Sequence, residues 1–274
     1  MIEMTGGELA EIIETSISNE IKKGCLKLSL AVILIGSDKA SEKYVALKQK
    51  ACEKVNINFL LFRFTEKNSQ IEILSLINKL NNDKNITGIM IQLPVPTGFV
   101  VEDLLEEILP TKDVDGLNSA NFGKLEKNIP GLYPATAEGI INLLRYYQIQ
   151  IAGKRVLVIG QGYLVGRPLI SMLLNENATV LTANIQTKNL AELTAFADII
   201  VSAAGCPKLL KGSMVKKNAV IIDAGTSLYH GKLTGDVDFS TLSSMASYIT
   251  PNPGGVGPMT VAMLLSNVVK AGRL

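Results

Sequence analysis

The chain has 274 residues, which at about 150 residues per domain leaves room for one large domain or two of ordinary size, and we expect two. Hydrophobic residues make up 47% of it and charged residues 19%, which excludes an intrinsically disordered protein because enough apolar surface is available to offset chain entropy. The net charge of +2 comes without any basic block, and there is no tryptophan, so we expect neither a phosphate-tracking surface nor a base-stacking platform for nucleic acid.

The cysteines and the apolar runs indicate the cellular compartment in which we expect the protein. Cys25, Cys52 and Cys206 form no Cys-x-x-Cys motif and leave an odd cysteine, which suits a reducing environment better than a disulfide framework. The first residues lack the basic and apolar regions of a signal peptide, and apolar runs such as Leu30 to Ile35 are too short to span a membrane. We therefore expect a cytoplasmic protein without a membrane partner.

Helical and strand patterns alternate through the first part of the chain. Apolar residues recur at helical spacing from Gly7 to Cys25, and the continuous apolar run LSLAVILIG then predicts a strand buried on both faces. The next expected elements are a helix over Ser41 to Val55, the strand INFLLFRF, a helix from Ser69 to Leu80, the strand GIMIQLP and a helix over Val101 to Ile108. This alternation predicts right-handed crossovers and an α/β fold with a parallel sheet.

The pattern loosens before it resumes. Several glycines and prolines between Asp113 and Pro134 predict a loop and a domain junction, and Thr136 is the expected N-cap of a helix that ends at Tyr147. Four buried strands then follow, with helices between them, one of these from Leu190 to Phe196: KRVLVIG, ATVLTAN, DIIVSAAG and AVIIDAG. They predict a second, doubly wound unit, after which a Pro/Gly turn leads into a final helix.

A glycine-rich loop follows the first strand of this second unit. Gly160, Gly162 and Gly166 stand between a strand and a helix, where they would let a pyrophosphate approach backbone N–H groups at the positive end of the helix. Asn184 ends the next strand, where an acidic residue would bind the ribose of NAD, and no arginine stands there for the 2′-phosphate of NADP. Asn184 can bind a ribose hydroxyl, which mildly favours NAD, or it can simply form a turn.

Two side chains share one face of a helix in the first unit. Tyr44 and Lys48 are four residues apart, so they lie one turn from each other. A buried lysine would have a lowered pKa and could transfer protons near neutral pH, and the ring would offer a stacking surface. The alternative is a solvated lysine on an exposed face that also carries Lys43 and Lys50.

Polar residues also stand at strand ends and in turns. Gln92 ends a buried strand, at the edge where α/β proteins bind ligands. Asp113 and Asp115 lie in the turn KDVDG, where they either cap the backbone or accept two N–H bonds from a ligand. The single histidine, His230, is expected at a hairpin tip and is assigned no catalytic role.

These motifs together resemble the methylenetetrahydrofolate dehydrogenase/cyclohydrolase family. YVALK with Lys48, IQLPVP with Gln92, KDVDG with Asp115 and ITPNPGGVGPMTVAML occur in the family's order over nearly the whole chain. The resemblance implies an α/β catalytic domain over residues 1–135, completed by the C-terminal helix 258–274, and a Rossmann-like, doubly wound NAD(P)-binding domain over residues 136–257. It also implies a homodimer.

The resemblance further implies an activity and its residues. The family oxidises 5,10-methylenetetrahydrofolate with NADP or NAD and hydrolyses the methenyl product to 10-formyltetrahydrofolate. As catalytic residues, Tyr44 would stack on the folate, Lys48 would assist hydrolysis, Gln92 would tune that lysine and Asp115 would hold the pterin edge. Further substrate contacts are implied for Ile91, Leu93, Pro253, Gly254, Gly255, Val256 and Gly257. Cofactor contacts are implied for Gly160, Gln161, Gly162, Gly166, Asn184, Ile185 and Thr226, and no metal is expected.

Departures from the family pattern lie mostly on the cofactor side. Where the family usually has Gly-Arg-Ser, this chain has Gly160-Gln161-Gly162, and where it has Cys-His-Ser after the next strand, this chain has Ala183-Asn184-Ile185. The family's Pro-Cys-Thr-Pro is replaced by Pro134-Ala135-Thr136-Ala137, and its Phe-His-Pro by Leu117-Asn118-Ser119.

Three hypotheses follow. The chain is a bifunctional enzyme whose dinucleotide preference has drifted from NADP, a cyclohydrolase with weak or lost dehydrogenase activity, or a non-catalytic folate- or nucleotide-binding protein.

Overall fold

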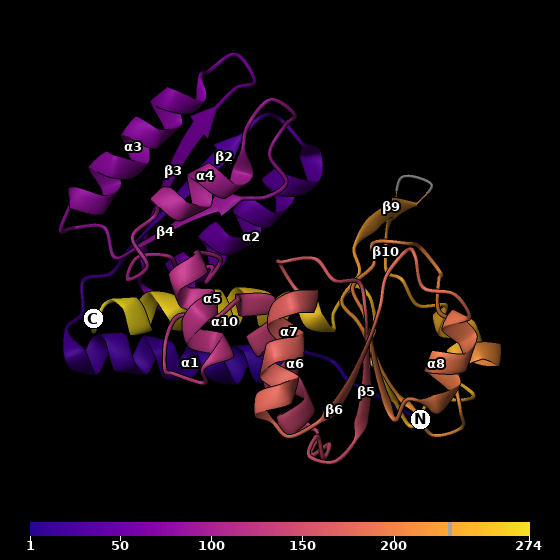
Figure 1. Ribbon diagram of the computed structural model, residues 1–274. Coiled ribbons are helices and arrows are strands. Elements are labelled where there is room, and N and C mark those ends of the chain that lie inside the picture. The colour runs from indigo at the N-terminus through magenta and orange to yellow at the C-terminus, as the bar shows by residue number, and fades with distance from the viewer. Residues whose placement is uncertain (230–231) are drawn as a thin grey trace. The chain divides into compact units, whose positions relative to one another are not determined.

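The computed structural model describes residues 1–229 and 232–274, which form two compact units (Figure 1). The six-stranded unit comprises Met1–Ala10 and Thr136–Thr260, and the three-stranded unit comprises Glu11–Ala135 and Val261–Leu274. This division differs from the expected one at the chain start, because β1 (Ile2–Glu3) pairs with β11 (Tyr248–Ile249) in the six-stranded sheet. The boundaries fall within α1 (Gly7–Gly24) and within α10 (Val256–Ala271).

The three-stranded unit is built on a parallel sheet of order β3-β2-β4. Its strands are β2 (Ser29–Ile35), β3 (Asn58–Phe64) and β4 (Gly88–Gln92), and its helices include α2 (Lys39–Val55), α3 (Gln70–Asn82), α4 (Val101–Glu107) and α5 (Ser119–Glu126). The central strand β2 is the continuous apolar run, and six of its seven residues are buried. Helix starts are set by local capping: Asp38 accepts a hydrogen bond from the backbone of Ser41, and Ser69 forms a capping box with Glu72.

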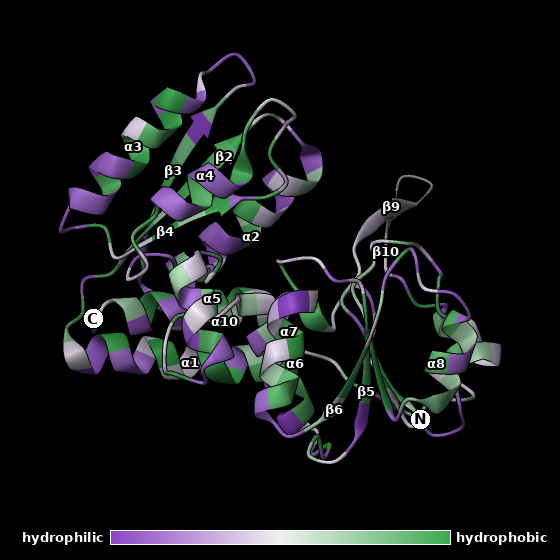
Figure 2. Ribbon diagram, in the orientation of Figure 1, coloured by the Kyte–Doolittle hydropathy of each residue, from purple (hydrophilic) through white to green (hydrophobic). Residues whose placement is uncertain are grey.

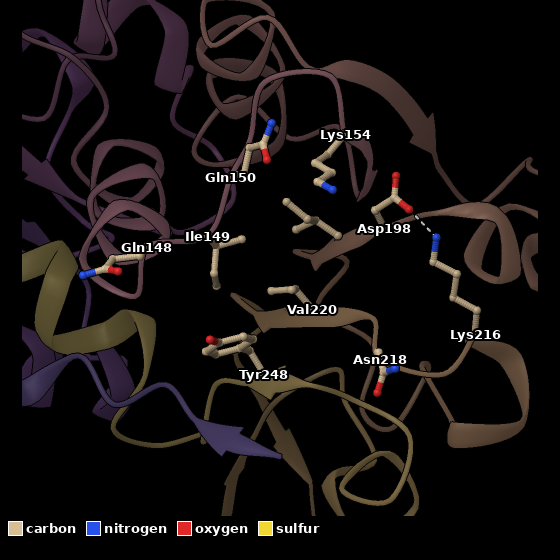
Figure 3. A pocket seen from close by; sticks show the side chains of 10 residues that line it. Gln148, Ile149, Gln150, Lys154, Asp198, Lys216, Asn218, Val220 and Tyr248 are labelled. Carbon is tan, nitrogen blue, oxygen red and sulfur yellow. Dashed lines mark hydrogen bonds and ion pairs between the residues drawn. The ribbon is translucent and has the colours of Figure 1, made fainter.

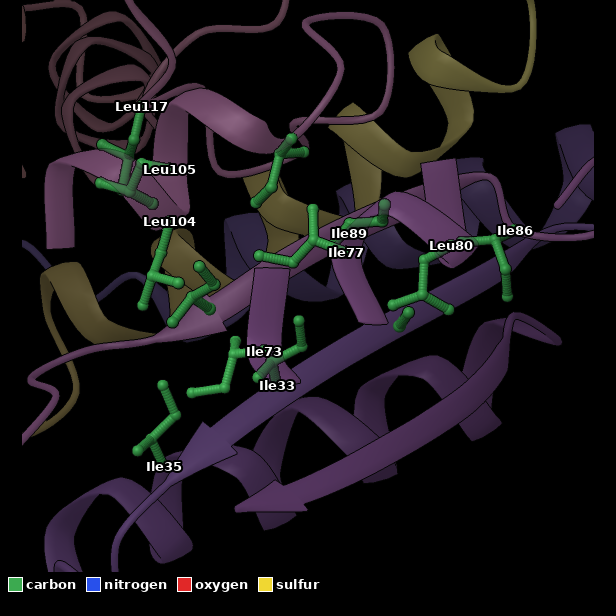
Figure 4. Close-up of a cluster of buried hydrophobic side chains, with 13 residues drawn as sticks. Ile33, Ile35, Ile73, Ile77, Leu80, Ile86, Ile89, Leu104, Leu105 and Leu117 are labelled. Atoms are coloured by element: carbon green, nitrogen blue, oxygen red, sulfur yellow. The ribbon is translucent and has the colours of Figure 1, made fainter. Parts of the chain in front are cut away.

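The core of this unit lies between the sheet and helices α3 and α4 (Figure 4). Ile33 of the sheet, Ile73 and Ile77 of α3, and Leu104 of α4 are fully buried in one cluster. Ile73 and Ile77 are four residues apart and therefore share one face of α3. Figure 2 shows the three strands as largely hydrophobic, whereas α3 carries both hydrophobic and hydrophilic residues. The amphipathic spacing thus places α3 on the sheet.

The six-stranded unit has a parallel sheet of order β1-β11-β8-β7-β5-β6. The remaining strands of this sheet are β5 (Arg155–Ile159), β6 (Thr179–Ala183), β7 (Ile199–Ser202) and β8 (Val220–Asp223). Its helices are α6 (Ala135–Tyr146), α7 (Gly166–Asn175), α8 (Leu190–Phe196), the short α9 (Phe239–Leu242) and the 3₁₀ turn η1 (Gly212–Met214). A hairpin of β9 (Ser227–Tyr229) and β10 (Lys232–Thr234) stands apart from this sheet, and His230 lies outside the described residues. The predicted α/β class with parallel sheets is confirmed.

Some local predictions are wrong. The stretch from Asp113 to Pro134 contains α5, whose start is capped by Asn118, so it is not loop throughout. Thr136 lies inside α6 and is not its N-cap; its hydroxyl instead accepts a hydrogen bond from Thr260. Strand β6 lies at the edge of the sheet and is only partly buried, because it pairs with β5 alone. No helix of the described residues is long and apolar enough to cross a membrane.

Candidate active site

A buried lysine and a glutamine face each other in the three-stranded unit. Lys48 on α2 is only 7% exposed, and its Nζ donates a hydrogen bond of 2.9 Å to Oε1 of Gln92, which ends β4. The other end of the Gln92 amide donates to the carbonyl of Leu93 at 2.7 Å, which fixes the acceptor oxygen toward the lysine. The alternative of a solvated Lys48 is therefore wrong, although Lys43 and Lys50 on the same helix are exposed.

The environment of Lys48 favours its neutral form. Burial lowers the pKa of Lys48, and the negative charge of Asp115 acts in the opposite direction. Burial likewise raises the pKa of Asp115, and the lysine lowers it. One turn further on α2, burial raises the pKa of the Cys52 thiol to about 12, so this cysteine stays protonated and is no nucleophile at neutral pH. The site thus holds one amine whose pKa is lowered from its ordinary value by burial.

The two carboxylates of the turn after β4 have different roles. Asp113 accepts hydrogen bonds from the backbone of Gly116 and Asn118 and from the side chain of Asn121, at 2.8 to 3.1 Å, so it organises the turn. Burial raises the pKa of Asp113 to about 6. None of these donors reaches Asp115, which is half-buried and interacts electrostatically with Lys48. Of the two aspartates, Asp115 is the one available to a ligand.

Helix α10 supports this turn through a residue that sequence reasoning missed. Asn267 is fully buried, and its side-chain amide donates to the carbonyl of Val114 at 2.9 Å and to that of Tyr133 at 2.8 Å. The first of these bonds holds the residue next to Asp115. An asparagine within the largely apolar sequence of this helix was the available signal, because a buried amide needs partners.

The remaining predicted substrate residues fall into two groups. Tyr44 is half-buried one turn before Lys48, Ile91 is buried in the sheet and Leu93 is half-buried beside Gln92, all in the three-stranded unit. The segment from Pro253 to Gly257 belongs to the six-stranded unit, at the start of α10. Gly254 in that segment has a φ of 108°, which an L side chain rarely adopts.

The glycine-rich loop joins β5 to α7 in the six-stranded unit. Gly160 has a φ of 99°, and a Cβ there would lie 2.2 Å from the carbonyl oxygen of Ala203. A Cβ on Gly166 would lie 2.0 Å from the carbonyl oxygen of Gly160, whereas one on Gly162 would meet no atom within 4 Å. No side chain caps the N-terminus of α7 at Val165. The backbone N–H of Arg167 donates to the carbonyl of Gly162 at 3.0 Å, and Pro168 has no N–H, so the close-packed glycine turn is the part that fits a dinucleotide phosphate.

A small polar network surrounds Gln161, the position at which the resemblance implied an arginine. The side chain of Gln161 donates to Thr182 at 2.9 Å and accepts from Asn184 at 3.0 Å. Asn184 also accepts the backbone N–H of Gln186, so it has the turn role that the sequence left open. Arg167, which sequence reasoning did not single out, donates to the backbone carbonyl of Gln161 at 3.1 Å.

Two predicted cofactor residues lie at the same ends of strands. The side chain of Ile185 is 97% exposed just after β6, and Thr226 is exposed in the loop that follows β8. Both follow carboxyl ends of parallel strands, the edge at which such sheets bind ligands.

A separate hollow of about 320 Å³ lies at the opposite, amino-terminal edge of the six-stranded sheet (Figure 3). Its lining includes Lys154, Tyr248, and Asp198, which is ion-paired with Arg155 and Lys216. The hydrogen bonds from Arg155, with those from Lys216, lower the pKa of Asp198 far below its usual range. None of the predicted site residues lines this hollow.

Comparisons with known proteins identify both parts of the chain. A family model described as tetrahydrofolate dehydrogenase/cyclohydrolase, catalytic domain, matches residues 4–115, and one described as the NAD(P)-binding domain of the same family matches residues 134–274. The bifunctional protein FolD of Campylobacter curvus is 46% identical over 265 residues, which are 96% of this chain and 91% of that protein.

Solved structures agree with these matches. The crystal structure of the bifunctional enzyme FolD, methylenetetrahydrofolate dehydrogenase/cyclohydrolase, from Campylobacter jejuni has a TM-score of 0.96 and 43% identity, and the match covers 100% of this chain and 99% of that one. The Trypanosoma brucei enzyme, solved with NADP and an inhibitor, has a TM-score of 0.95 and 33% identity, with coverage of 100% and 97%. The resemblance seen in the sequence is confirmed: this chain belongs to the tetrahydrofolate dehydrogenase/cyclohydrolase family.

Proposed function

We propose that the protein oxidises 5,10-methylenetetrahydrofolate with a nicotinamide dinucleotide and hydrolyses the methenyl product to 10-formyltetrahydrofolate. The observation that carries this proposal is the buried hydrogen bond between Lys48 and Gln92, with Asp115 as the nearby charge. Burying an amine beside a neutral amide costs free energy, and groups perturbed in this way are concentrated at functional sites. Family membership supplies the substrate class.

The oxidation needs alignment more than it needs a base. Hydride leaves the methylene carbon as N5 of the folate donates its lone pair, so no protein group has to remove a proton. When bound, the dinucleotide supplies the hydride acceptor. The glycine turn of Gly160 and Gly166 would let the pyrophosphate approach the backbone before α7, and Tyr44 would hold the folate ring by stacking.

The hydrolysis needs proton transfer, and Lys48 is placed for it. Water adds to the methenyl carbon and loses one proton, which leaves a hydroxyl on that carbon. The bond from the carbon to N5 then breaks as N5 takes up a proton and the hydroxyl releases its proton to solvent, forming the formyl C=O. The neutral amine of Lys48 accepts the proton from water and returns it to N5, while Gln92 keeps the amine in place. Asp115 accepts N–H bonds from the pterin edge.

Replacing Lys48 by alanine tests this assignment. We expect methenyltetrahydrofolate hydrolysis to fall by about 10²- to 10⁴-fold, the usual contribution of a positioned acid–base group, while oxidation persists. Lys50→Ala is the matched control, because that lysine is on the same helix and exposed. Unchanged hydrolysis in Lys48→Ala would refute the role of the residue.

We further propose that the protein prefers NAD to NADP. Gln161 puts a neutral amide, already bonded to Thr182 and Asn184, where the family has an arginine for the 2′-phosphate. Titration of the wild-type protein with both dinucleotides measures the preference. Gln161→Arg should tighten NADP binding about 10- to 100-fold relative to NAD, the worth of one charge-assisted hydrogen bond. A wild-type protein that binds NADP more tightly than NAD would contradict the proposal.

A second candidate is a cyclohydrolase whose dehydrogenase step is weak, which is favoured by the replacement of the family's Arg and Ser by Gln161 and Gly162. Assays of oxidation with each dinucleotide and of methenyl hydrolysis alone distinguish the two candidates. Methenyl hydrolysis at a substantial rate would exclude a merely folate-binding protein.

We also propose a homodimer, for which light scattering would give twice the chain mass of 29.5 kDa.

A further inference from the structure

A buried aspartate in the six-stranded unit has no part in the chemistry above. Asp236 follows β10 and is fully buried. Its Oδ2 accepts hydrogen bonds from the Ser202 hydroxyl at 2.9 Å and from the backbone N–H groups of Ala204 and Gly205 at 2.7 and 3.3 Å. Its Oδ1 accepts the N–H of Cys206 at 2.8 Å. All four donors are uncharged and come from the end of β7 and the loop that follows it.

This loop borders the glycine-rich turn. Strand β7 is the neighbour of β5 in the sheet, and the two are parallel, so the segments that follow them leave the same edge. Gly160 packs so closely on the carbonyl of Ala203 that a side chain at residue 160 would overlap it. Ala204, Gly205 and Cys206 are exposed beyond this contact. The loop of residues 203–206 therefore lies at the ligand-binding edge, in backbone contact with the proposed pyrophosphate turn.

The backbone around Asp236 is itself fixed by a second carboxylate. Asp223, at the end of β8, accepts the N–H groups of Asp236 at 3.0 Å and of Val237 at 3.2 Å. A Cβ on Gly225 would lie 2.1 Å from the carboxyl carbon of Asp236, so only glycine leaves room for that carboxylate. The position of Asp236 is thus set from its backbone and from its side chain.

We propose that Asp236 is a positioning residue for dinucleotide binding, acting through the loop of residues 203–206. Its carboxylate accepts the backbone N–H groups of residues 204–206 and so fixes the part of the loop that directly follows Ala203, the residue on which Gly160 packs. Without it these groups would turn toward water, and a dinucleotide would have to order the loop on binding, which weakens affinity. The inference rests on the proposed dinucleotide-dependent oxidation and adds the residue that keeps the site in shape.

Replacing Asp236 by asparagine tests the proposal in the full chain. An amide cannot accept at both of its ends, so one end would present a donor to the loop's own N–H groups. We expect faster hydrogen exchange at the backbone amides of residues 204–206. We also expect the Kd for the dinucleotide that the wild type prefers, NAD or NADP, to rise about tenfold or more. The dinucleotide KM should rise to the same extent, while kcat at saturating dinucleotide and methenyl hydrolysis stay unchanged.

Two further variants keep the result interpretable. Asp238→Asn is the matched control, because that carboxylate accepts the Ser240 hydroxyl at 2.7 Å and no bond from the loop. Ser202→Ala removes one donor to Asp236 but keeps the carboxylate, so a smaller rise in Kd is expected and can be measured even if Asp236→Asn fails to fold.

The outcomes separate this inference from the proposed function. A wild-type protein that binds neither dinucleotide would refute the proposed oxidation. A wild type that binds, together with folded Asp236→Asn protein of unchanged affinity or unchanged loop exchange, would overturn the positioning role alone. If Asp236→Asn does not fold, an unchanged Kd in Ser202→Ala overturns it.

Discussion

Replacing Gln92 by glutamate would reverse the electrostatic setting of Lys48. The amide oxygen that now accepts the lysine's hydrogen bond at 2.9 Å is neutral, and burial lowers the pKa of the amine. A carboxylate at that position would stabilise the ammonium form and raise the pKa of Lys48. The change alters few atoms, so it tests charge more than packing.

The size of this effect follows from the geometry. Two unit charges separated by 2.9 Å attract by about 6 kcal/mol at an effective dielectric constant of about 20. Burial of the new carboxylate opposes this attraction by several kcal/mol, which leaves roughly 1.5–4 kcal/mol. A difference of that size raises the pKa of Lys48 by about 1 to 3.

The pH dependence of methenyl hydrolysis is the assay. If neutral Lys48 accepts the proton from water, the rate rises with pH through the pKa of the amine, and in Gln92→Glu this rise moves to higher pH. At neutral pH the rate then falls about 10- to 1000-fold. Gln92→Leu is the control, because it removes the hydrogen bond without adding charge and should not move the rise upward. A Gln92→Glu profile that is unmoved, or moved to lower pH, would refute the reasoning.

The remaining predictions concern stability and binding. Gly160→Ala should lower the Tm and abolish dinucleotide binding, because the positive φ of residue 160 alone costs an alanine about 1–2 kcal/mol. Gly162→Ala should keep the wild-type Tm, because a Cβ there meets no atom within 4 Å. Equal effects of the two variants would contradict the close packing of Gly160 on Ala203. The pKa of Asp113 is raised from 3.8 to about 6, so between these pH values the folded state holds a proton that the unfolded state has lost. Asp113 therefore adds about 3 kcal/mol to the free energy of unfolding at low pH, and this contribution is lost as the pH rises from about 4 through 6. Urea unfolding of Asp113→Asn across that range should lack this decline, and a variant with the wild-type slope would speak against it. Asn267→Ala removes the donor to the buried carbonyl of Val114 and to the partly buried carbonyl of Tyr133. It should cost about 1–3 kcal/mol in urea unfolding, against no change if water replaces the amide.

The fold was predictable wherever the local pattern decides the structure. The apolar run of β2 is buried because it lies in the middle of its sheet, and helix α8 begins and ends where its spacing predicts, at Leu190 and Phe196. Strands β1 and β11 have two residues each, too few for any period, and exist because they pair with each other. Helix α5 was missed because the glycines and prolines around it outweighed the cap at Asn118.

The sequence indicated which side chains share a face or a turn, but not the environment of each. Helical spacing places Tyr44 and Lys48 on one face, yet charged neighbours on α2 hide the burial of Lys48, which depends on a glutamine 44 residues away in the chain. The division of labour between Asp113 and Asp115 is equally invisible in the sequence, since it depends on which carboxylate the turn's own N–H groups reach. The hydrogen bond from Asn267 to Val114 joins residues 153 positions apart.

The placement of Val261–Leu274 with the unit that begins at Glu11 has a consequence for synthesis. The sheet of that unit can form once residue 92 has left the ribosome, but the turn that carries Asp115 gains its support from Asn267 only after the whole six-stranded unit has been made. During translation the strands of both sheets therefore exist before the substrate side of the protein is complete. A chain that has emerged only as far as residue 260 would hold the folded glycine-rich loop but would lack the hydrogen bond from Asn267 to the Asp115 turn, so under the proposed function dinucleotide binding and methenyl hydrolysis would appear at different chain lengths.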